Sequence, residues 1–105
     1  MSYVIELSKL AEQYFRSKLS AEQRRYLKQQ LIDVLAEDPL GRSVRSSRGF
    51  PKLRLFETLL KQDEYEHEFS VEFAILSKDR IGVAAISVVV YRFLSDGSRV
   101  PVWPA

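Results

Sequence analysis

The stretch Gly41–Leu55, GRSVRSSRGFPKLRL, marks the point at which the chain changes its hydrophobic pattern. Before it, apolar residues recur at helical spacing, and after it they alternate with polar residues at every second position. Side chains three or four residues apart share a face of a helix, whereas side chains two apart share a face of a strand. The stretch therefore separates a helical N-terminal part from a C-terminal part that is predicted to be a sheet.

The helical part is predicted to be a hairpin of two helices. Residues 8–18 form an amphipathic pattern, and Ser8 can cap its start. Ser20 and Gln23 have the spacing of a capping box, which predicts the start of a second, longer helix. This helix ends before Pro39, because proline cannot continue a helix. A short connection between two helices favours an antiparallel arrangement.

The remaining segments predict strands, at Tyr3–Leu7, Lys52–Thr58, Phe69–Ile75, Ile81–Phe93 and, as a possible short edge strand, Val100–Trp103. Residues 59–66, LLKQDEYE, are interpreted as a polar connection. The order β-α-α-β-β-β, with a possible extra C-terminal strand, predicts an α+β fold in which the helical hairpin packs on one face of a twisted antiparallel sheet. A chain of 105 residues is expected to form a single domain, residues 1–105.

Charge is divided sharply along the chain. The stretch at 41–55 contains five basic residues and no acidic one, namely Arg42, Arg45, Arg48, Lys52 and Arg54. The following block, 56–75, has six acidic residues and one lysine. Because Lys52 and Arg54 alternate with leucines, we expect both to point from the same, open face of the sheet. Such a pair would attract a polyanion, although cations also protect exposed strand edges from unwanted pairing.

Composition excludes several classes of site and of protein. The chain has no cysteine, so it has neither disulfides nor a thiolate nucleophile. It has one histidine, His67, and we expect neither a metal nor a cofactor. No signal peptide or membrane-spanning helix is expected, and a cytoplasmic location is predicted. The net charge of only +2 indicates that any anion binding is local.

Several motifs, in their order and spacing, resemble the RelE/ParE superfamily of bacterial toxin–antitoxin toxins. A YVIEL strand runs directly into a helical hairpin that ends in LAEDPLG. A KLRL strand follows a Gly-Phe-Pro turn, and an IGVAAISVVVYR strand closes the core. Together these segments cover residues 3–93. The chain departs from the family in having Ser70 and Glu72 on its third strand, and in having Trp103 as its only late aromatic residue.

The resemblance implies a toxin of a type II toxin–antitoxin module whose expression arrests growth. RelE-like members are ribosome-dependent endoribonucleases, or mRNA interferases, that use clustered cations on the open sheet face. By position, Lys52, Arg54, Tyr91 and Arg92 match such a catalytic cluster, with Lys52 as base or transition-state clamp and Arg54 as phosphate clamp. Arg42, Arg45 and Arg48 would bind RNA. Tyr91 and Arg92 could equally serve only to pack the end of a strand.

Two further residues are candidates for acid–base chemistry. Neighbouring carboxylates would favour the charged form of His67, which would suit a general acid. Glu72 would face Lys52 or Arg54 across the sheet, either as a catalytic carboxylate or as a simple charge partner. A lone surface histidine more often has no catalytic role.

Three functions remain open from the sequence. The first is an mRNA-cutting toxin that acts on the ribosome, and the second is a ParE-like toxin of the same fold that poisons DNA gyrase. Either toxin would have an acidic, partly disordered antitoxin as its partner, docked on the sheet edge or on the helix face that carries Arg24, Arg25 and Lys28. The third is a non-catalytic protein-binding module or inhibitor, which the small positive excess and the acidic block 57–68 favour.

Overall fold

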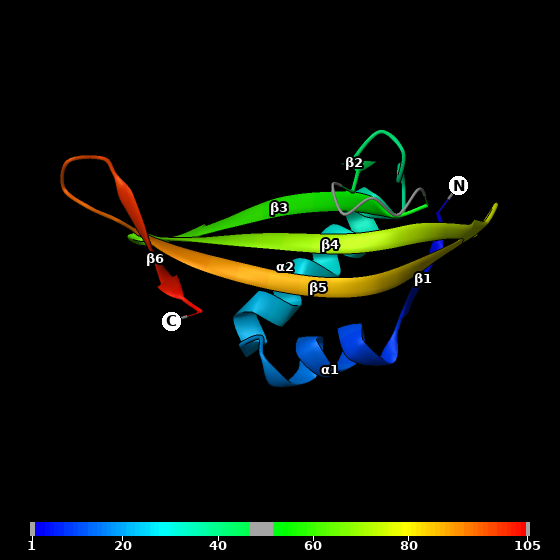
Figure 1. Ribbon diagram of the computed structural model, residues 1–105, viewed down its shortest axis with the longest axis horizontal. Coiled ribbons are helices and arrows are strands. Elements are labelled where there is room, and N and C mark those ends of the chain that lie inside the picture. The colour runs from blue at the N-terminus through cyan, green and yellow to red at the C-terminus, as the bar shows by residue number, and fades with distance from the viewer. Residues whose placement is uncertain (1, 47–51, 105) are drawn as a thin grey trace.

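A helical hairpin lies across one face of a long β-sheet (Figure 1). The computed structural model describes residues 2–46 and 52–104. In this part of the chain the helical elements are α1 (Lys9–Ser17), α2 (Ala21–Gln30) and a π-helical segment, η1 (Leu31–Leu35), that continues α2. The strands are β1 (Val4–Leu7), β2 (Val44–Arg45), β3 (Arg54–Gln62), β4 (Tyr65–Ser77), β5 (Arg80–Phe93) and β6 (Arg99–Trp103).

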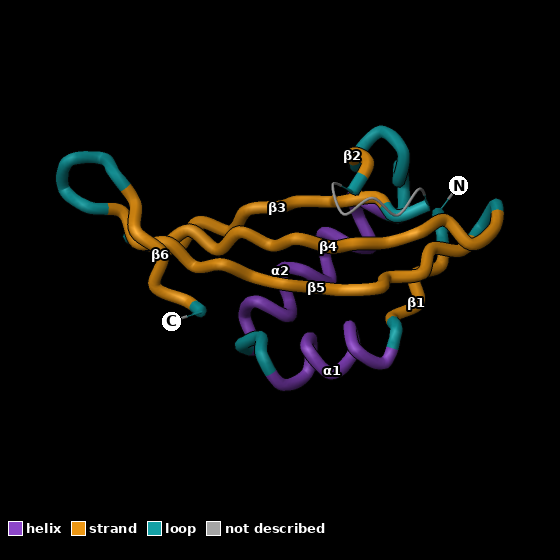
Figure 2. Tube along the Cα trace, in the orientation of Figure 1, coloured by secondary structure: helices purple, strands orange, loops and turns teal. Residues whose placement is uncertain are grey.

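The strands follow the order β1-β5-β4-β3-β2, and β6 pairs with the C-terminal end of β5 (Figure 2). Strands β3, β4 and β5 form a continuous antiparallel meander, whereas β1 runs parallel to β5 with Val4 opposite Arg80. The predicted α+β fold and its element order are confirmed, including the additional C-terminal strand. The parallel pairing of β1 makes the sheet mixed rather than wholly antiparallel.

Both predicted helix starts are confirmed. The Ser8 hydroxyl accepts a hydrogen bond from the Ala11 amide at 3.1 Å. The Gln23 backbone amide donates a hydrogen bond to the Ser20 hydroxyl at 3.1 Å. The side-chain carbonyl of Gln23 accepts one from the Ser20 backbone amide at 2.8 Å, which completes the capping box. These bonds satisfy amides that the first turn of a helix leaves without a partner. The π-helical segment was not predicted; in it the Ala36 amide donates to the Leu31 carbonyl at 2.8 Å.

The predicted boundaries of the strand that begins at Lys52 and of the connection at 59–66 are wrong. Lys52 lies in a turn before β3, and the strand continues to Gln62. The connection is a tight turn at Asp63 and Glu64, where Asp63 has a φ of 52°. Aspartate tolerates this left-handed conformation better than most residues. The polar residues of 59–66 do not break the strands because alternate positions face away from the core.

The core lies between the sheet and the helices. Phe69, Val71 and Phe73 of β4 are completely buried, as are neighbouring side chains of β5. Leu27 and Leu35 cover them from α2 and η1. Burial of a single side chain of this size contributes about 1.5–3 kcal/mol. The alternating apolar residues of β4 therefore determine which face of the sheet the helices cover.

Helix α1 lies against the edge of β5 between the part that pairs with β1 and the part that pairs with β6. The Ser8 amide donates to the Val83 carbonyl at 2.9 Å, and the Ser8 hydroxyl donates to the Ala84 carbonyl at 2.9 Å. Further along, the Val88 amide donates to the Tyr14 hydroxyl at 3.0 Å. The N-cap residue Ser8 and the Tyr14 hydroxyl of α1 thus take the place of a strand partner on this edge.

We expect Tyr14→Phe to lower the free energy of unfolding by roughly 1–3 kcal/mol, because the Val88 amide would lose its partner in a part-buried position. Tyr3→Phe is the matched control, since Tyr3 packs against the core and its hydroxyl has no hydrogen bond in the described part of the chain. Its effect should stay within about 0.5 kcal/mol. Urea unfolding followed by circular dichroism measures both. Equal losses in the two variants would contradict a role for the Tyr14 hydroxyl.

Candidate functional site

The expectation that Lys52 and Arg54 project together from the open face is wrong. Arg54 shares its side of β3 with Phe56, which is 3% exposed in the core, so its side chain lies on the face that the helices cover. Lys52 is exposed in the turn before the strand and is not held by the sheet ladder. The predicted alternation is present from Arg54 onward, but the predicted faces are reversed, since Leu55 was expected to be buried. Leu55 faces outward, opposite Glu72.

The four residues predicted as catalytic do not come together. Arg54 lies opposite Phe73, whereas Arg92 lies opposite Tyr65. These two positions on β4 are roughly 26 Å apart at about 3.3 Å per residue. Tyr91 and Arg92 are consecutive strand residues and point to opposite faces. Arg92 lies 3.7 Å from Glu64 in an exposed ion pair.

Cations gather instead at the corner formed by β2 and the start of β3. Arg45 lies directly opposite Arg54 in the ladder, and Arg42 is exposed in the preceding turn. Ser43 orients the Arg54 guanidinium through two hydrogen bonds. Arg54 Nε donates to the Ser43 hydroxyl at 2.7 Å, and Arg54 Nη2 donates to the Ser43 carbonyl at 3.1 Å. Among the described residues no carboxylate pairs with these three arginines. The third predicted RNA-binding residue, Arg48, lies outside the described residues.

His67 and Glu72 are also separated, because they lie on opposite faces of β4. His67 faces the helices, where the Gln23 side-chain amide donates to its Nδ1 at 2.8 Å. Burial lowers the pKa of His67 below its ordinary value of 6.5, against a smaller opposite effect of Glu22. The predicted preference for the charged form is therefore wrong. Glu72 faces outward and accepts a hydrogen bond from the Ser46 hydroxyl at 2.9 Å.

The surface that the helices leave uncovered is acidic and apolar. We call it the open face; it comprises the outward residues of β3, β4 and β5, which are Leu55, Glu57, Leu59, Lys61, Glu66, Glu68, Ser70, Glu72, Ala85, Ser87, Val89 and Tyr91. Four of these are glutamates and one is a lysine. A neighbouring hollow of about 430 Å³ forms where the small side chains Ser70, Ala85 and Ser87 meet beside Leu55.

One arginine from β6 is already bound on the open face. The Arg99 guanidinium lies 4.0 Å from the centre of the Tyr91 ring and forms ion pairs with Glu66 and Glu68, the latter at 3.5 Å. Glu66 is only 6% exposed, whereas the Arg99 side chain is 41% exposed, so the carboxylate is shielded from water and the guanidinium is partly solvated. An aromatic ring together with carboxylates is a favourable site for a guanidinium. The open face can therefore hold a positively charged side chain.

Nothing in the described residues forms a metal site, since no three His, Asp or Glu side chains lie close enough together to share an ion. Across the same residues, no helix has the length and hydrophobicity to cross a membrane.

Comparisons of this chain with protein-family models, curated proteins and solved structures found no match. The resemblance to RelE/ParE toxins therefore stays a prediction.

The acidic open face was readable in the sequence but was missed. From Tyr65 onward, Glu66, Glu68 and Glu72 alternate with residues that β4 buries. Counting that alternation from residue 65 instead of 69 extends the strand and assigns the glutamates to one face. The many charged residues at 57–68 favoured a loop, so the alternation of glutamates with buried residues was not recognised as part of a strand.

Stability should depend on the protonation of His67. Because the folded-state pKa lies below 6.5, the unfolded chain binds this proton more readily. The contribution of His67 to the free energy of unfolding is complete above pH 6.5, and it should decline as the pH falls from 6.5 towards the lowered pKa. His67→Gln should remove this component. Urea unfolding of both proteins between pH 8 and 5 measures the difference, and parallel pH profiles would contradict it.

Proposed function

We propose that this protein is a non-catalytic protein-binding module whose open face binds a basic segment of a partner. The observation that carries the proposal is the pattern of outward residues on β3 and β4, in which glutamates surround exposed leucine. Leu59 is 46% exposed and lies opposite Glu68. Glu57 is exposed and has no ion-pair partner among the described residues.

The mixture of apolar and acidic side chains favours a protein partner. Carboxylates repel phosphate, so the open face is unsuited to nucleic acid. Leu55, Leu59 and Val89 provide apolar contact positions on two rows of the sheet, because Leu59 and Val89 both lie opposite Glu68. Protein interfaces combine such an apolar centre with charged residues that select and orient the partner. A partner segment that carries both basic and aliphatic residues would match this surface.

Arg99 illustrates the chemistry that such a partner would use. It already combines contact with an aromatic ring and two carboxylates of the open face. Glu57 lies one strand away from the Arg99 site and is exposed to solvent. A basic partner would therefore find a second acidic position beside Leu59 without displacing Arg99.

The double variant Glu57→Lys/Glu68→Lys should weaken binding of a synthetic peptide that alternates lysine and leucine. Removing favourable charge pairs and adding repulsive ones is expected to weaken binding by about tenfold or more. Asp33→Lys is the control for a single charge reversal at an exposed position on η1, which is half the charge change of the double variant. Amide chemical-shift titration of the labelled protein would show shifts on β3 and β4. Shifts confined to other elements would contradict the proposal.

A second candidate function is the toxin that the sequence resemblance implies. Two observations favour it: the element order agrees with the resemblance, and the β2–β3 corner concentrates positive charge. Like charges directly opposite each other in a ladder are unfavourable, and an anion between Arg45 and Arg54 would relieve the repulsion. In this alternative the corner binds RNA, an acidic antitoxin neutralises it, and the protein acts in the cytoplasm on the ribosome or on DNA gyrase.

Induced expression in bacteria distinguishes the two functions. The toxin predicts growth arrest, with translation stopping before DNA synthesis for a ribosome-dependent nuclease and the reverse order for a gyrase poison. Replacing Lys52 and Arg54 together by alanine should relieve the arrest, whereas Lys9→Ala on α1 should not. Normal growth during full expression would argue for the binding module. Arrest that persists in the double variant would remove these two residues from any toxic mechanism.

A further inference from the structure

The ladder along β3 has a short gap. Strand β2 pairs with β3 only as far as Val44, which lies opposite Leu55. Further along, the Tyr26 hydroxyl donates to the Leu59 carbonyl, so the backbone groups of Leu59 point away from β4. In an antiparallel ladder, every second residue directs both backbone groups to the same side. The N–H and C=O of Glu57 therefore point into the space between these two contacts, and neither has a partner among the described residues.

The turn before β2 is the reason for this gap. If β2 continued in the same register, Arg42 would lie opposite Glu57. Instead, the Arg42 amide donates to the Asp38 carbonyl at 3.0 Å, and the Gly41 amide donates to Asp38 Oδ1 at 3.0 Å. A Cβ atom at Gly41 would lie only 2.1 Å from Asp38 Oδ2, so the tight turn depends on glycine. The turn thus directs the backbone of Arg42 away from β3.

A hollow of about 480 Å³ lies at the gap, between the end of α2 with η1 on one side and the edge of β3 on the other. Sites for small molecules have volumes of about 300–1,000 Å³ and combine apolar walls with a few polar groups. Val34 and Phe56 line the hollow with hydrocarbon. Gln30 also lines it and accepts the Thr58 hydroxyl with Oε1 at 3.1 Å. The side-chain nitrogen of Gln30 has no partner in the described part of the chain, so it can donate to a ligand.

The end of the hollow next to β2 is positive. Arg42 lines it, and Arg45 and Arg54 lie opposite each other in the adjoining ladder. Arg54 is oriented by Ser43, whereas Arg42 is exposed and is paired with no carboxylate of residues 2–46 or 52–104. The hollow therefore offers an available guanidinium beside an unpaired backbone N–H.

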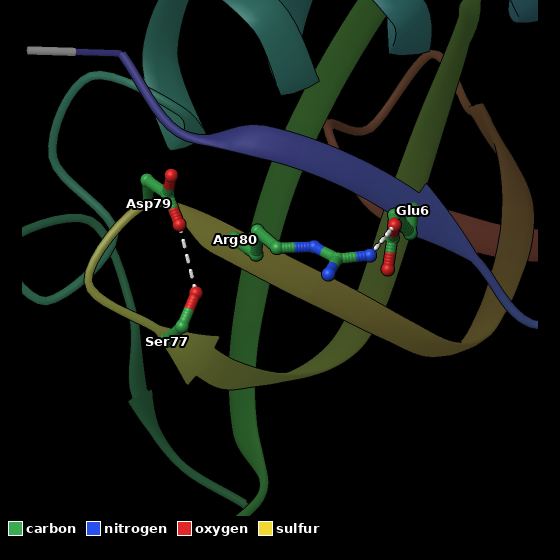
Figure 3. Close-up of polar contacts among 4 residues, drawn as sticks. All are labelled: Glu6, Ser77, Asp79 and Arg80. Atoms are coloured by element: carbon green, nitrogen blue, oxygen red, sulfur yellow. Dashed lines mark hydrogen bonds and ion pairs between the residues drawn. The ribbon is translucent and has the colours of Figure 1, made fainter.

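The charged groups at the opposite edge of the sheet are paired within the chain. Figure 3 shows the Arg80 guanidinium reaching Glu6 of β1, with which it forms a hydrogen-bonded ion pair. Beside it, the Ser77 hydroxyl donates to Asp79 at 2.8 Å. A small anion that approaches the sheet thus finds a paired arginine at the β1 edge and an unpaired one, Arg42, at the β3 edge.

We propose that this hollow binds a small molecule in which an acylated amino group adjoins a carboxylate, that is, an N-acyl amino acid. The ligand N–H would donate to the Glu57 carbonyl, and one carboxylate oxygen would accept the Glu57 N–H, as in a hydrogen-bonded pair of an antiparallel ladder. The second carboxylate oxygen would accept from Arg42 in a charge-assisted bond. The acyl carbonyl would accept from the side-chain nitrogen of Gln30.

The direction of the ladder limits the length of the ligand. A ligand antiparallel to β3 runs in the same direction as β2, so its carboxylate end points towards Val44, where β2 already occupies the edge. At its other end, the Tyr26 hydroxyl already occupies the Leu59 carbonyl. The gap therefore accommodates one residue that ends in a free carboxylate, and a strand of another protein cannot continue through it.

N-acetyl-leucine is a suitable probe, because the side chain of a residue opposite Glu57 would lie on the same face as Leu55 and Leu59. Its titration into the full chain, followed by chemical shifts, should move the amides of Arg42 and Glu57 and leave those of β1 unchanged. Arg42→Gln should weaken binding by about tenfold or more. Arg16→Gln is the matched control, since Arg16 is an exposed arginine of α1 that does not line the hollow.

Two analogues of the probe test the two ends of the proposed contact. N-acetyl-leucinamide lacks the negative charge, and N-acetyl-N-methyl-leucine lacks the N–H donor; each should bind about tenfold more weakly than N-acetyl-leucine. Equal binding of all three compounds would overturn the proposal. Equally effective competition by inorganic phosphate would do so too, because it would show a corner that accepts any anion.

A tetrapeptide that ends in leucine distinguishes a free small molecule from the C-terminus of a protein. The closed end at Tyr26 predicts that the tetrapeptide binds more weakly than N-acetyl-leucine. Tighter binding of the tetrapeptide would overturn the proposed ligand class and assign the hollow to a protein terminus. These outcomes do not depend on recognition by the open face, because no glutamate side chain of that face is changed.

Discussion

The alternation of side chains along β4 is the constraint on which the rest of the structure depends. Phe69, Val71 and Phe73 are completely buried, so the intervening residues must face the other way. Shifting the strand by one residue would expose all three and direct glutamates into the core. Each exposed phenylalanine would cost about 1.5–3 kcal/mol, and each unpaired buried carboxylate several kcal/mol more. The acidic character of the open face is thus a direct consequence of where the core lies.

The same alternation separates the side chains that were predicted to act in catalysis. General acid–base catalysis needs its groups within hydrogen-bonding distance of a common substrate. Arg54 and Arg92 lie near opposite ends of the sheet, and His67 and Glu72 lie on opposite faces of one strand. Among the described residues, these predicted catalytic and acid–base side chains therefore do not form one assembled cluster.

The helices are joined to the sheet by hydrogen bonds as well as by apolar contacts. Gln23 completes the capping box of α2 and contacts His67 of β4. Tyr26 donates to the Leu59 carbonyl, and its hydroxyl lies 2.7 Å from Thr58 Oγ1. Helix α2 is therefore anchored to β3 and β4 by polar contacts as well as by the core. The open face consequently belongs to a sheet whose other face is held to the helices by these contacts.

The sequence by itself determined the elements whose signals are local. Ser8, and Ser20 with Gln23, predicted both helix starts because a cap depends on residues within one turn. The valine-rich segment at 81–93 predicted β5, and the change of period after the 41–55 stretch predicted the α+β class. Only the tertiary structure decided the face of Arg54, the neighbours of His67 and the partner of Arg99. Those depend on strand register and on which face the helices cover, and both are settled by contacts between residues far apart in the chain.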